Sequence, residues 1–274
     1  MAAVGGEGSW TVQPTQHEEQ PVFITDHTLA QQLGARAHQA DAAAHHHNPI
    51  TGHRAWVLLD GIGDREHVAD WTPRTALALA SAAAGLGDPR AAIELARPVL
   101  HAERAHHGHP KKWPADAAAI IAVLNFAGDL SIAWAGDCRA YFAERGQAHL
   151  LTTDHNEAAH QRRARQTPSP DAHDRLTSSL MFLRGEIGGT EVRFGPRRGT
   201  RRLLLASDGA YLPHEAAGVF PIPDGSSSLA RRPRFLAPVL TGPRERVAQR
   251  LTELAVRNTP NADNATALVI DLTG

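Results

Sequence analysis

The sequence predicts a single α+β domain. Short apolar strands joined by glycine-containing turns gather in the middle of the chain, while helical segments stand in separate groups before and after them. No internal repeat or linker-like stretch divides the 274 residues. A hydrophobic content of 42% is ordinary for a globular protein and supplies a buried core.

The first segments of the chain differ sharply in composition. Residues 1–20 are rich in glycine and glutamine without periodicity, which predicts a flexible N-terminal arm before a domain at 21–274. Val22-Phe23-Ile24 is a candidate first strand. Residues 55–59 form a continuous apolar run of the length typical of a buried strand.

Two helical stretches follow. Thr72 has the residue type of an N-cap and Pro73 suits a first turn, which predicts a helix that runs to about Ala84. Residues 91–105 predict a second helical stretch. Pro98 lies inside it, so this stretch is either kinked or divided into two shorter helices.

The middle of the chain has the character of β structure. Residues 118–124, 130–135 and 138–143 are strand-like and are separated by turn sequences, which predicts an antiparallel meander. Residues 156–175 are polar, rich in arginine and interrupted by two prolines. We expect a mobile surface insert there.

The last part of the chain contains a strand, a loop, a helix and a final strand. Residues 203–206 predict a strand, and the prolines and serines of 220–234 predict a loop. Pro243 opens a helix that should end near Asn258. Residues 267–270 predict the last strand.

Charge and cysteine content exclude several classes of protein. The net charge of -1 gives no electrostatic reason to expect nucleic acid or an anionic membrane as a partner. Cys138 is the single cysteine, so an internal disulfide framework is excluded and a reducing compartment is indicated. No apolar stretch approaches the length of a membrane span. We therefore expect a cytoplasmic protein.

Acidic residues stand next to three predicted strands. Asp60-Gly61 and Asp208-Gly209 each follow an apolar strand, and Asp263-Asn264 precedes the last one. Converging carboxylates at strand ends suit a hard divalent cation. The alternative for each Asp-Gly pair is a plain turn, since this dipeptide is common in turns.

Six short motifs give these acids a context. In chain order they are Arg36-Ala37-His38-Gln39-Ala40-Asp41, Asp60-Gly61-Ile62-Gly63, Gly136-Asp137-Cys138-Arg139-Ala140-Tyr141, Leu151-Thr152-Thr153-Asp154-His155, Ser207-Asp208-Gly209 and Asp263-Asn264-Ala265-Thr266. The series resembles the metal-dependent protein phosphatase family of the protein phosphatase 2C type, in a divergent bacterial form. The resemblance covers roughly residues 22–272. It implies a four-layer αββα sandwich of two antiparallel sheets flanked by helices.

The resemblance also implies a role for each matching residue. Asp60 would bridge two Mn²⁺ or Mg²⁺ ions, and the carbonyl of Gly61 would bind one of them. Asp208 and Asp263 would complete the shell of the first ion. Asp41 would act through water molecules bound to the second ion, and Arg36 would bind the substrate phosphate. Asp137 matches a residue that helps to bind a third ion in some members.

The implied reaction is hydrolysis of phosphoserine or phosphothreonine by direct attack of a metal-bridging water. The substrate would be a phosphorylated protein, and a serine/threonine kinase pathway would supply it in bacterial signalling. The region 156–175 occupies the place of the family's flap. Its arginines either steer the phosphorylated substrate or form a plain solvated helix face.

The chain departs from the family pattern at several positions. Ala40 stands where an acid or amide is usual, and Leu212 replaces the usual partner of Asp137. Asp116 and Met181 also replace family residues, and Asp64 replaces a glycine. Ala40, Asp116 and Met181 favour one rival, an inactive or weakly active phosphoprotein-binding regulator. A second rival is a hydrolase of small phosphate esters.

Overall fold

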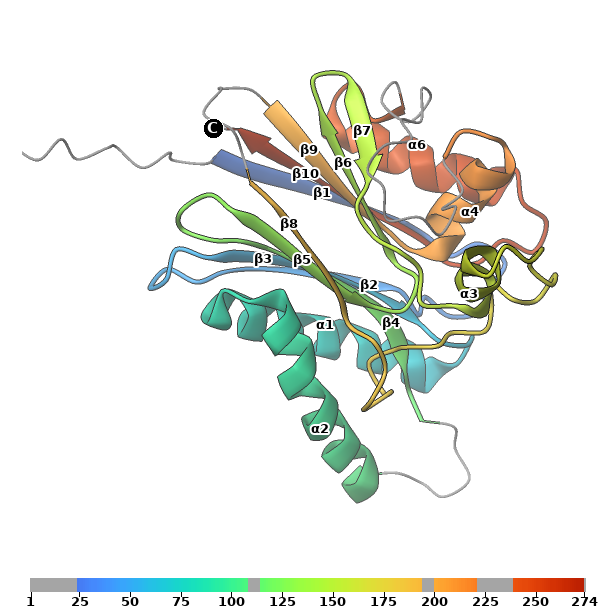
Figure 1. Ribbon diagram of the computed structural model, residues 1–274, viewed down its shortest axis with the longest axis horizontal. Helices are drawn as coiled ribbons and strands as arrows, with labels where there is room; N and C mark the ends of the chain where they lie inside the picture. Colours follow the sequence, from blue (N-terminus) through green and yellow to red (C-terminus); the bar gives the residue numbers. More distant parts are fainter. Residues whose placement is uncertain (1–23, 108–113, 194–199, 221–238, 274) are drawn as a thin grey trace, which may run out of the picture.

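The computed structural model describes residues 24–107, 114–193, 200–220 and 239–273. Two five-stranded antiparallel sheets lie face to face, and helices cover both outer faces (Figure 1). The predicted α+β sandwich is therefore confirmed. The arm expected at 1–20 and nearly all of the loop expected at 220–234 lie outside the described residues.

The two sheets are built from different parts of the chain. Sheet A has the strand order β1-β10-β9-β6-β7, and sheet B has the order β2-β3-β4-β5-β8. The strands of sheet A are β1 (Ile24–Gln32), β10 (Ala265–Thr273), β9 (Thr200–Ala206), β6 (Arg139–Glu144) and β7 (Gln147–Leu150). Those of sheet B are β2 (Ala42–His47), β3 (Arg54–Gly61), β4 (Ala117–Leu124), β5 (Leu130–Ala135) and β8 (Gly188–Val192).

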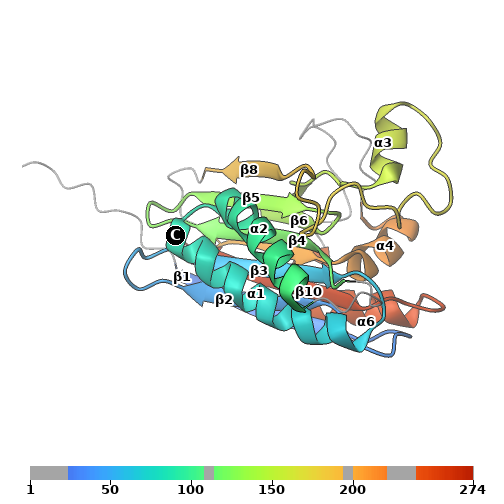
Figure 2. The same cartoon turned by 90° about the horizontal axis from the view of Figure 1, so that it is seen from below.

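The helices pack on the sheets in two pairs. Sheet B is covered by α1 (Glu66–Leu86) and α2 (Pro89–His107), as Figure 2 shows from below. Sheet A is covered by α4 (Asp208–Ala216) and α6 (Arg244–Arg257), and α3 (Glu157–Arg163) lies at one end of the sandwich near α4. Among the helices within the described ranges, none has the length and apolarity to span a bilayer.

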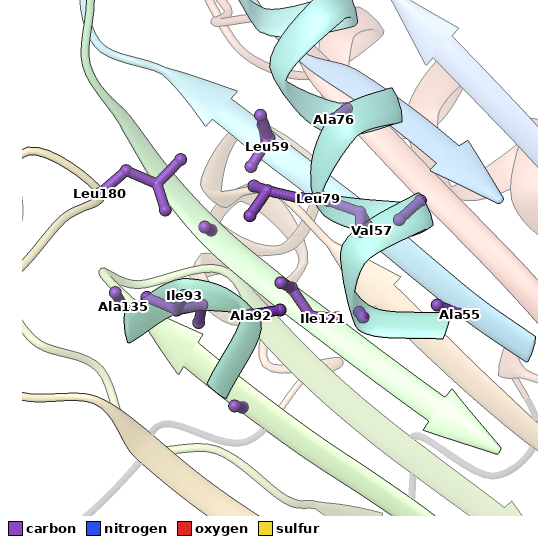
Figure 3. Packing of buried hydrophobic residues seen from close by; sticks show 14 of the residues in the cluster. Ala55, Val57, Leu59, Ala76, Leu79, Ala92, Ile93, Ile121, Ala135 and Leu180 are labelled. Atoms are coloured by element: carbon purple, nitrogen blue, oxygen red, sulfur yellow. The ribbon is translucent and has the colours of Figure 1, made fainter. Parts of the chain in front are cut away.

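Apolar side chains fill the three spaces between the four layers. Figure 3 shows the outermost space on the sheet B side, where Leu79 of α1 and Ile93 of α2 face Val57, Leu59 and Ile121. The inner faces of both sheets meet in a second cluster around Trp56, and α4 and α6 bury a third against sheet A. Burial of each such side chain stabilises the fold by about 1.5–3 kcal/mol.

The first helix begins earlier than the sequence predicts. Helix α1 starts at Glu66, so Thr72 is not its N-cap; the buried Thr72 hydroxyl instead donates to the Val68 carbonyl one turn before it. Val68 is already buried, and its packing extends the helix upstream past Pro73. The helix ends as expected, with Gly87 in the left-handed region at φ 68°.

The predicted strands of the middle region exist, but they do not form one meander. Strands β4 and β5 pair in sheet B, whereas β6 and β7 pair in sheet A. The chain crosses between the sheets at Gly136, whose φ is 117°. A Cβ there would lie 2.4 Å from the Ala118 Cβ, so only glycine fits this crossing.

Candidate functional site

The strand register brings the predicted motifs to one end of the sandwich. In sheet A, Ala206 at the end of β9 pairs with Ala267 near the start of β10 and with Arg139 at the start of β6. In sheet B, Ala42 at the start of β2 pairs with Leu59, and Asp60 pairs with Ala118. The connections next to these positions therefore share one edge.

Each sheet contributes two carboxylates to that edge. Asp60 is the penultimate residue of β3, and Asp41 directly precedes β2. Asp208 is the first residue of α4, separated from β9 by Ser207 alone, and Asp263 lies two residues before β10. All four candidate ligands come from rigid ends of regular elements.

Hydrogen bonds join the two sheets inside this site. The Ser207 hydroxyl donates to Asp41 Oδ2 at 2.9 Å, and its oxygen accepts the backbone N–H of Thr266 at 2.9 Å. The Asp208 N–H points at Asp60 Oδ2 at 3.4 Å. Ser207 was not identified as a site residue, although it belongs to a motif that was.

The glycine after each aspartate allows backbone segments to come close. A Cβ on Gly209 would lie 2.1 Å from the carbonyl oxygen of Asn264, and a Cβ on Gly61 would lie 2.5 Å from that of Ala40. The sequence predicts close approach of a carbonyl or a phosphate at these glycines. In the structure the neighbour is a backbone carbonyl just before the adjacent strand of the same sheet, β10 for Gly209 and β2 for Gly61.

The carboxylates raise one another's pKa. Burial, followed by repulsion from Asp208 and Asp41, raises the pKa of Asp60 well above its usual range. Burial raises the pKa of Asp41 to about 7 against the opposing effect of its hydrogen bonds. Burial and then Asp263 raise the pKa of Asp208 to about 6. Such a cluster lacks positive charge, which a divalent cation would supply.

Arg36 lies at the mouth of the site. Its Nη2 is 2.5 Å from Asp263 Oδ2, and both side chains are 40% exposed. A small cavity of about 30 Å³ lies beside this pair and is lined by Arg36, Ala40, Gly61, Gly63, Asp64, Asp263 and Asn264. The guanidinium thus stands where an anion could approach the carboxylates.

Asp137 is close to the site but has a different environment. It is buried, accepts a long hydrogen bond of 3.4 Å from Asn156 Nδ2, and its carbonyl accepts the Tyr211 hydroxyl. Burial, then Asp208, raises its pKa well above the usual range. Leu212, at the position of its usual family partner, packs against the cluster under α4, so the second acid of a third-ion site is missing.

The carboxylates of this site are suitable ligands for a divalent cation, but their present arrangement would have to change to bind one. Oxygen ligands from carboxylates are those that Mg²⁺ and Mn²⁺ prefer. Within the described residues, no three His, Cys, Asp or Glu side chains are already arranged to hold an ion. Asp263 would have to exchange Arg36 for the cation, and Asp41 is turned toward Ser207.

Two departures from the family pattern contact each other. Asp116 Oδ1 accepts the N–H of Met181, and its Oδ2 accepts the Ser179 hydroxyl at 2.6 Å. The Asp116 carbonyl accepts the N–H of Ile62, next to Gly61. Asp116 thus ties the segment around Met181 to the site loop, a role that its type alone does not reveal.

A buried ionic cluster holds α4, which carries Asp208. Arg139 makes two hydrogen bonds of 2.8 and 2.7 Å to Asp154, and a third of 2.6 Å to Glu215 of α4. Its guanidinium lies 3.8 Å from the centre of the Tyr211 ring. The side chains of Arg139 and Asp154 are fully buried. Pairing of this kind fixes geometry more than it adds stability.

Comparisons with known proteins agree with this fold. The family model described as Protein phosphatase 2C matches residues 65–167, which contain Asp137 but none of the other four carboxylates. No curated protein sequence matches the chain.

Solved structures match over nearly the whole chain. Stp1 of Staphylococcus aureus, a serine/threonine phosphatase, is 20% identical with a TM-score of 0.71, covering 92% of this chain and 96% of that one. The S. agalactiae serine/threonine phosphatase is 19% identical with a TM-score of 0.69, covering 90% and 99%. The catalytic domain of the phosphatase PstP, solved with two manganese ions, is 22% identical with a TM-score of 0.63, covering 92% and 100%.

Proposed function

We propose that this chain, whose fold and family match confirm its resemblance to protein phosphatase 2C, is a Mn²⁺- or Mg²⁺-dependent protein serine/threonine phosphatase. The observation that carries the proposal is the convergence of Asp41, Asp60, Asp208 and Asp263 beside Arg36. Its substrate would be a cytoplasmic protein phosphorylated by a serine/threonine kinase. The manganese ions of the PstP structure support a two-ion site.

Asp60, Asp208 and Asp263, with the Gly61 carbonyl, would hold the ions, and Asp41 would act from its position behind Ser207. Two bound cations would supply a water activated for attack on phosphorus and would neutralise charge on the phosphate. The residues of this chain do the rest. Ser207 orients Asp41, and the Arg139 cluster holds α4 through Glu215 near the end of that helix.

Arg36 would bind the phosphate of the substrate. A guanidinium presents a planar fork of donors that matches two phosphate oxygens. Its raised pKa, set by Asp263 and other nearby acids against the effect of burial, keeps it charged. If Asp263 bound a cation in place of Arg36, the donors of Arg36 would be free to bind a phosphate.

Phosphate release from a phosphothreonine peptide tests this function. We expect turnover with Mn²⁺, none with chelator, and none for Asp208→Ala. Full activity in chelator, or a trapped covalent phosphoenzyme, would contradict the proposal. A preference for phosphopeptide over para-nitrophenyl phosphate would distinguish a protein phosphatase from a hydrolase of small esters.

Two observations favour a second function. The Arg36–Asp263 ion pair and the absence of a ready chelating arrangement within the described residues suit a weakly active, phosphoprotein-binding regulator. A folded protein that binds a phosphopeptide but does not hydrolyse it in Mn²⁺ would favour that function.

A further inference from the structure

Asp64 lies opposite the loop that carries Arg36. This loop connects β1 and β2, whereas Asp64 lies between β3 and α1; Arg36 and Asp64 both line the small cavity. The Asp64 carboxylate accepts two successive backbone N–H groups of the loop, that of Ala37 through Oδ2 at 2.8 Å and that of His38 through Oδ1 at 2.9 Å. One carboxylate thus binds two successive amides of this loop.

The same carboxylate also contacts a side chain. His38 Nδ1 lies 3.1 Å from Asp64 Oδ1. The N–H of Ala37, with smaller effects of His38, lowers the pKa of Asp64, so this carboxyl is ionised at neutral pH. Hydrogen bonds from N–H groups to an ionised acceptor are stronger than those between neutral groups.

Other contacts hold the ends of the loop but not its tip. Asn264 accepts the N–H of Ala40 and donates to the carbonyl of Leu33, and the N–H of Ala35 donates to Ala262. These anchors stand on the β10 side. The peptides directly after Arg36 are held from the β3 side, by Asp64.

We propose that Asp64 is a positioning residue, which fixes the backbone after Arg36 so that the guanidinium stays at the mouth of the site. The glycine usual in the family at this position has no side chain for such a contact. This inference rests on the proposed role of Arg36 in phosphate binding. It assigns to Asp64 no contact with the substrate.

Two measurements on Asp64→Ala and Asp64→Asn test the proposal, with Asp70→Ala and Asp70→Asn as matched controls. Asp70 is an exposed aspartate on α1, remote from the loop in sequence and without a catalytic assignment. The first measurement is amide hydrogen exchange of Ala37 and His38 in ¹⁵N-labelled full chain with Mg²⁺. We expect exchange at both amides to accelerate roughly tenfold in Asp64→Ala, because each loses its acceptor, and less in Asp64→Asn.

The second measurement separates positioning from general loss of structure. We expect KM for para-nitrophenyl phosphate, and the inhibition constant of inorganic phosphate, to rise roughly tenfold, with kcat within about twofold and Mn²⁺ affinity unchanged. Unchanged exchange at Ala37 and His38 would overturn the proposal. So would faster exchange with unaltered KM, or acceleration that spreads through β3 and α1.

The role of Asp64 can be tested even if the proposed phosphatase function is wrong. If the wild-type chain has no turnover, the proposed function fails, while exchange at the two amides and the dissociation constant of inorganic phosphate with Mg²⁺ still decide the role of Asp64. In that case faster exchange with about tenfold weaker phosphate binding supports it, and any other combination contradicts it.

Discussion

The Ser207 hydroxyl donates to Asp41 across the interface of the two sheets at 2.9 Å. Because its oxygen also accepts the N–H of Thr266, this one hydroxyl links β2, β9 and β10 at the site. We predict that Ser207→Ala lowers the free energy of unfolding by about 1–2 kcal/mol and weakens Mn²⁺ binding, since Asp41 loses a donor to its ionised form. Chemical denaturation and Mn²⁺ titration measure the two effects. An unaltered Mn²⁺ affinity would show that Ser207 only supports the fold.

The acid cluster predicts a pH dependence of the metal-free protein. The pKa values of Asp41 and Asp208 are raised in the folded state to about 7 and about 6, from an ordinary value of 3.8. Between the ordinary and the raised values the folded state binds more protons, so these groups lower stability as pH rises. We expect these two groups to lower the free energy of unfolding by on the order of a few kcal/mol between pH 4 and pH 7.5.

The comparison of wild type with Asp41→Asn isolates this contribution, because half-buried histidines such as His45, whose pKa burial lowers, have the opposite dependence. In metal-free buffer the unfolding free energy of the variant should fall less from pH 5 to pH 7.5. At pH 7.5, Mn²⁺ should raise the unfolding free energy of the wild type back toward its value at pH 5, and should raise that of the variant less. Parallel pH curves for the two proteins would contradict this prediction.

Gly209 is predicted to tolerate no side chain. A Cβ would lie 2.1 Å from the Asn264 carbonyl oxygen, in backbone that cannot move without shifting Asp208 and Asp263. We expect Gly209→Ala to destabilise the protein by about 3 kcal/mol and to abolish Mn²⁺ binding. Gly85, in helix α1 with open space around it, is the matched control. Gly85→Ala should stabilise by about 0.5–1 kcal/mol. Thermal unfolding distinguishes the two directions.

The buried cluster around Arg139 predicts a large effect of a single substitution. Arg139→Leu would leave Asp154 and Glu215 as buried carboxylates without a counter-charge. We expect a loss of about 3–5 kcal/mol. Glu94→Gln, which breaks the exposed pair with Arg90, should change stability by less than about 0.5 kcal/mol. If urea denaturation gave equal losses of unfolding free energy for Arg139→Leu and Glu94→Gln, the buried cluster would not have the stabilising role assigned to it.

The arginines next to α3 predict a difference between substrates. Arg163 and Arg165 are exposed, whereas Arg162 contacts His173 at 2.8 Å. Substitution of the exposed pair by glutamine should raise KM several-fold for an acidic phosphopeptide and little for para-nitrophenyl phosphate, if they attract the peptide through charge. The effect should shrink at high salt. Arg246→Gln, on the exposed side of α6, is the control; a similar change there would indicate a non-specific charge effect.

The fold was predictable where a strand is buried on both faces. Residues of β3, β4 and β9 form continuous apolar runs, and all three strands were predicted near their observed positions. Of β1, only Ile24 falls within the candidate strand at 22–24, whose other two residues lie outside the described ranges, and β2 was not predicted. Both strands lie at sheet edges and carry polar residues, including three histidines in β2. An edge strand needs a neighbour rather than an apolar sequence. The neighbour of β1 is the distant β10, whereas β2 pairs with β3, the next strand in the chain.

The site was predictable as a set of residue types but not as a set of contacts. The order of the motifs singled out Asp60 and Asp208, and the register of two sheets brings them together. The contacts of Asp64 and Asp116 were not predictable, since both look like departures from a pattern. Each is a carboxylate whose backbone N–H partners come from a segment distant in sequence. Such pairings are visible only in three dimensions.

The position of β10 has a consequence for when the site can exist. This strand is the last of those described, yet it lies between β1 and β9 in sheet A and begins two residues after Asp263. During synthesis from the N-terminus, β1 therefore has no partner until β10 emerges, and the acid group next to it arrives at the same time. A ribosome-bound chain that ends before residue 263 should thus be unable to assemble the centre. Completion of sheet A and assembly of the acidic site would therefore occur at the same stage of synthesis.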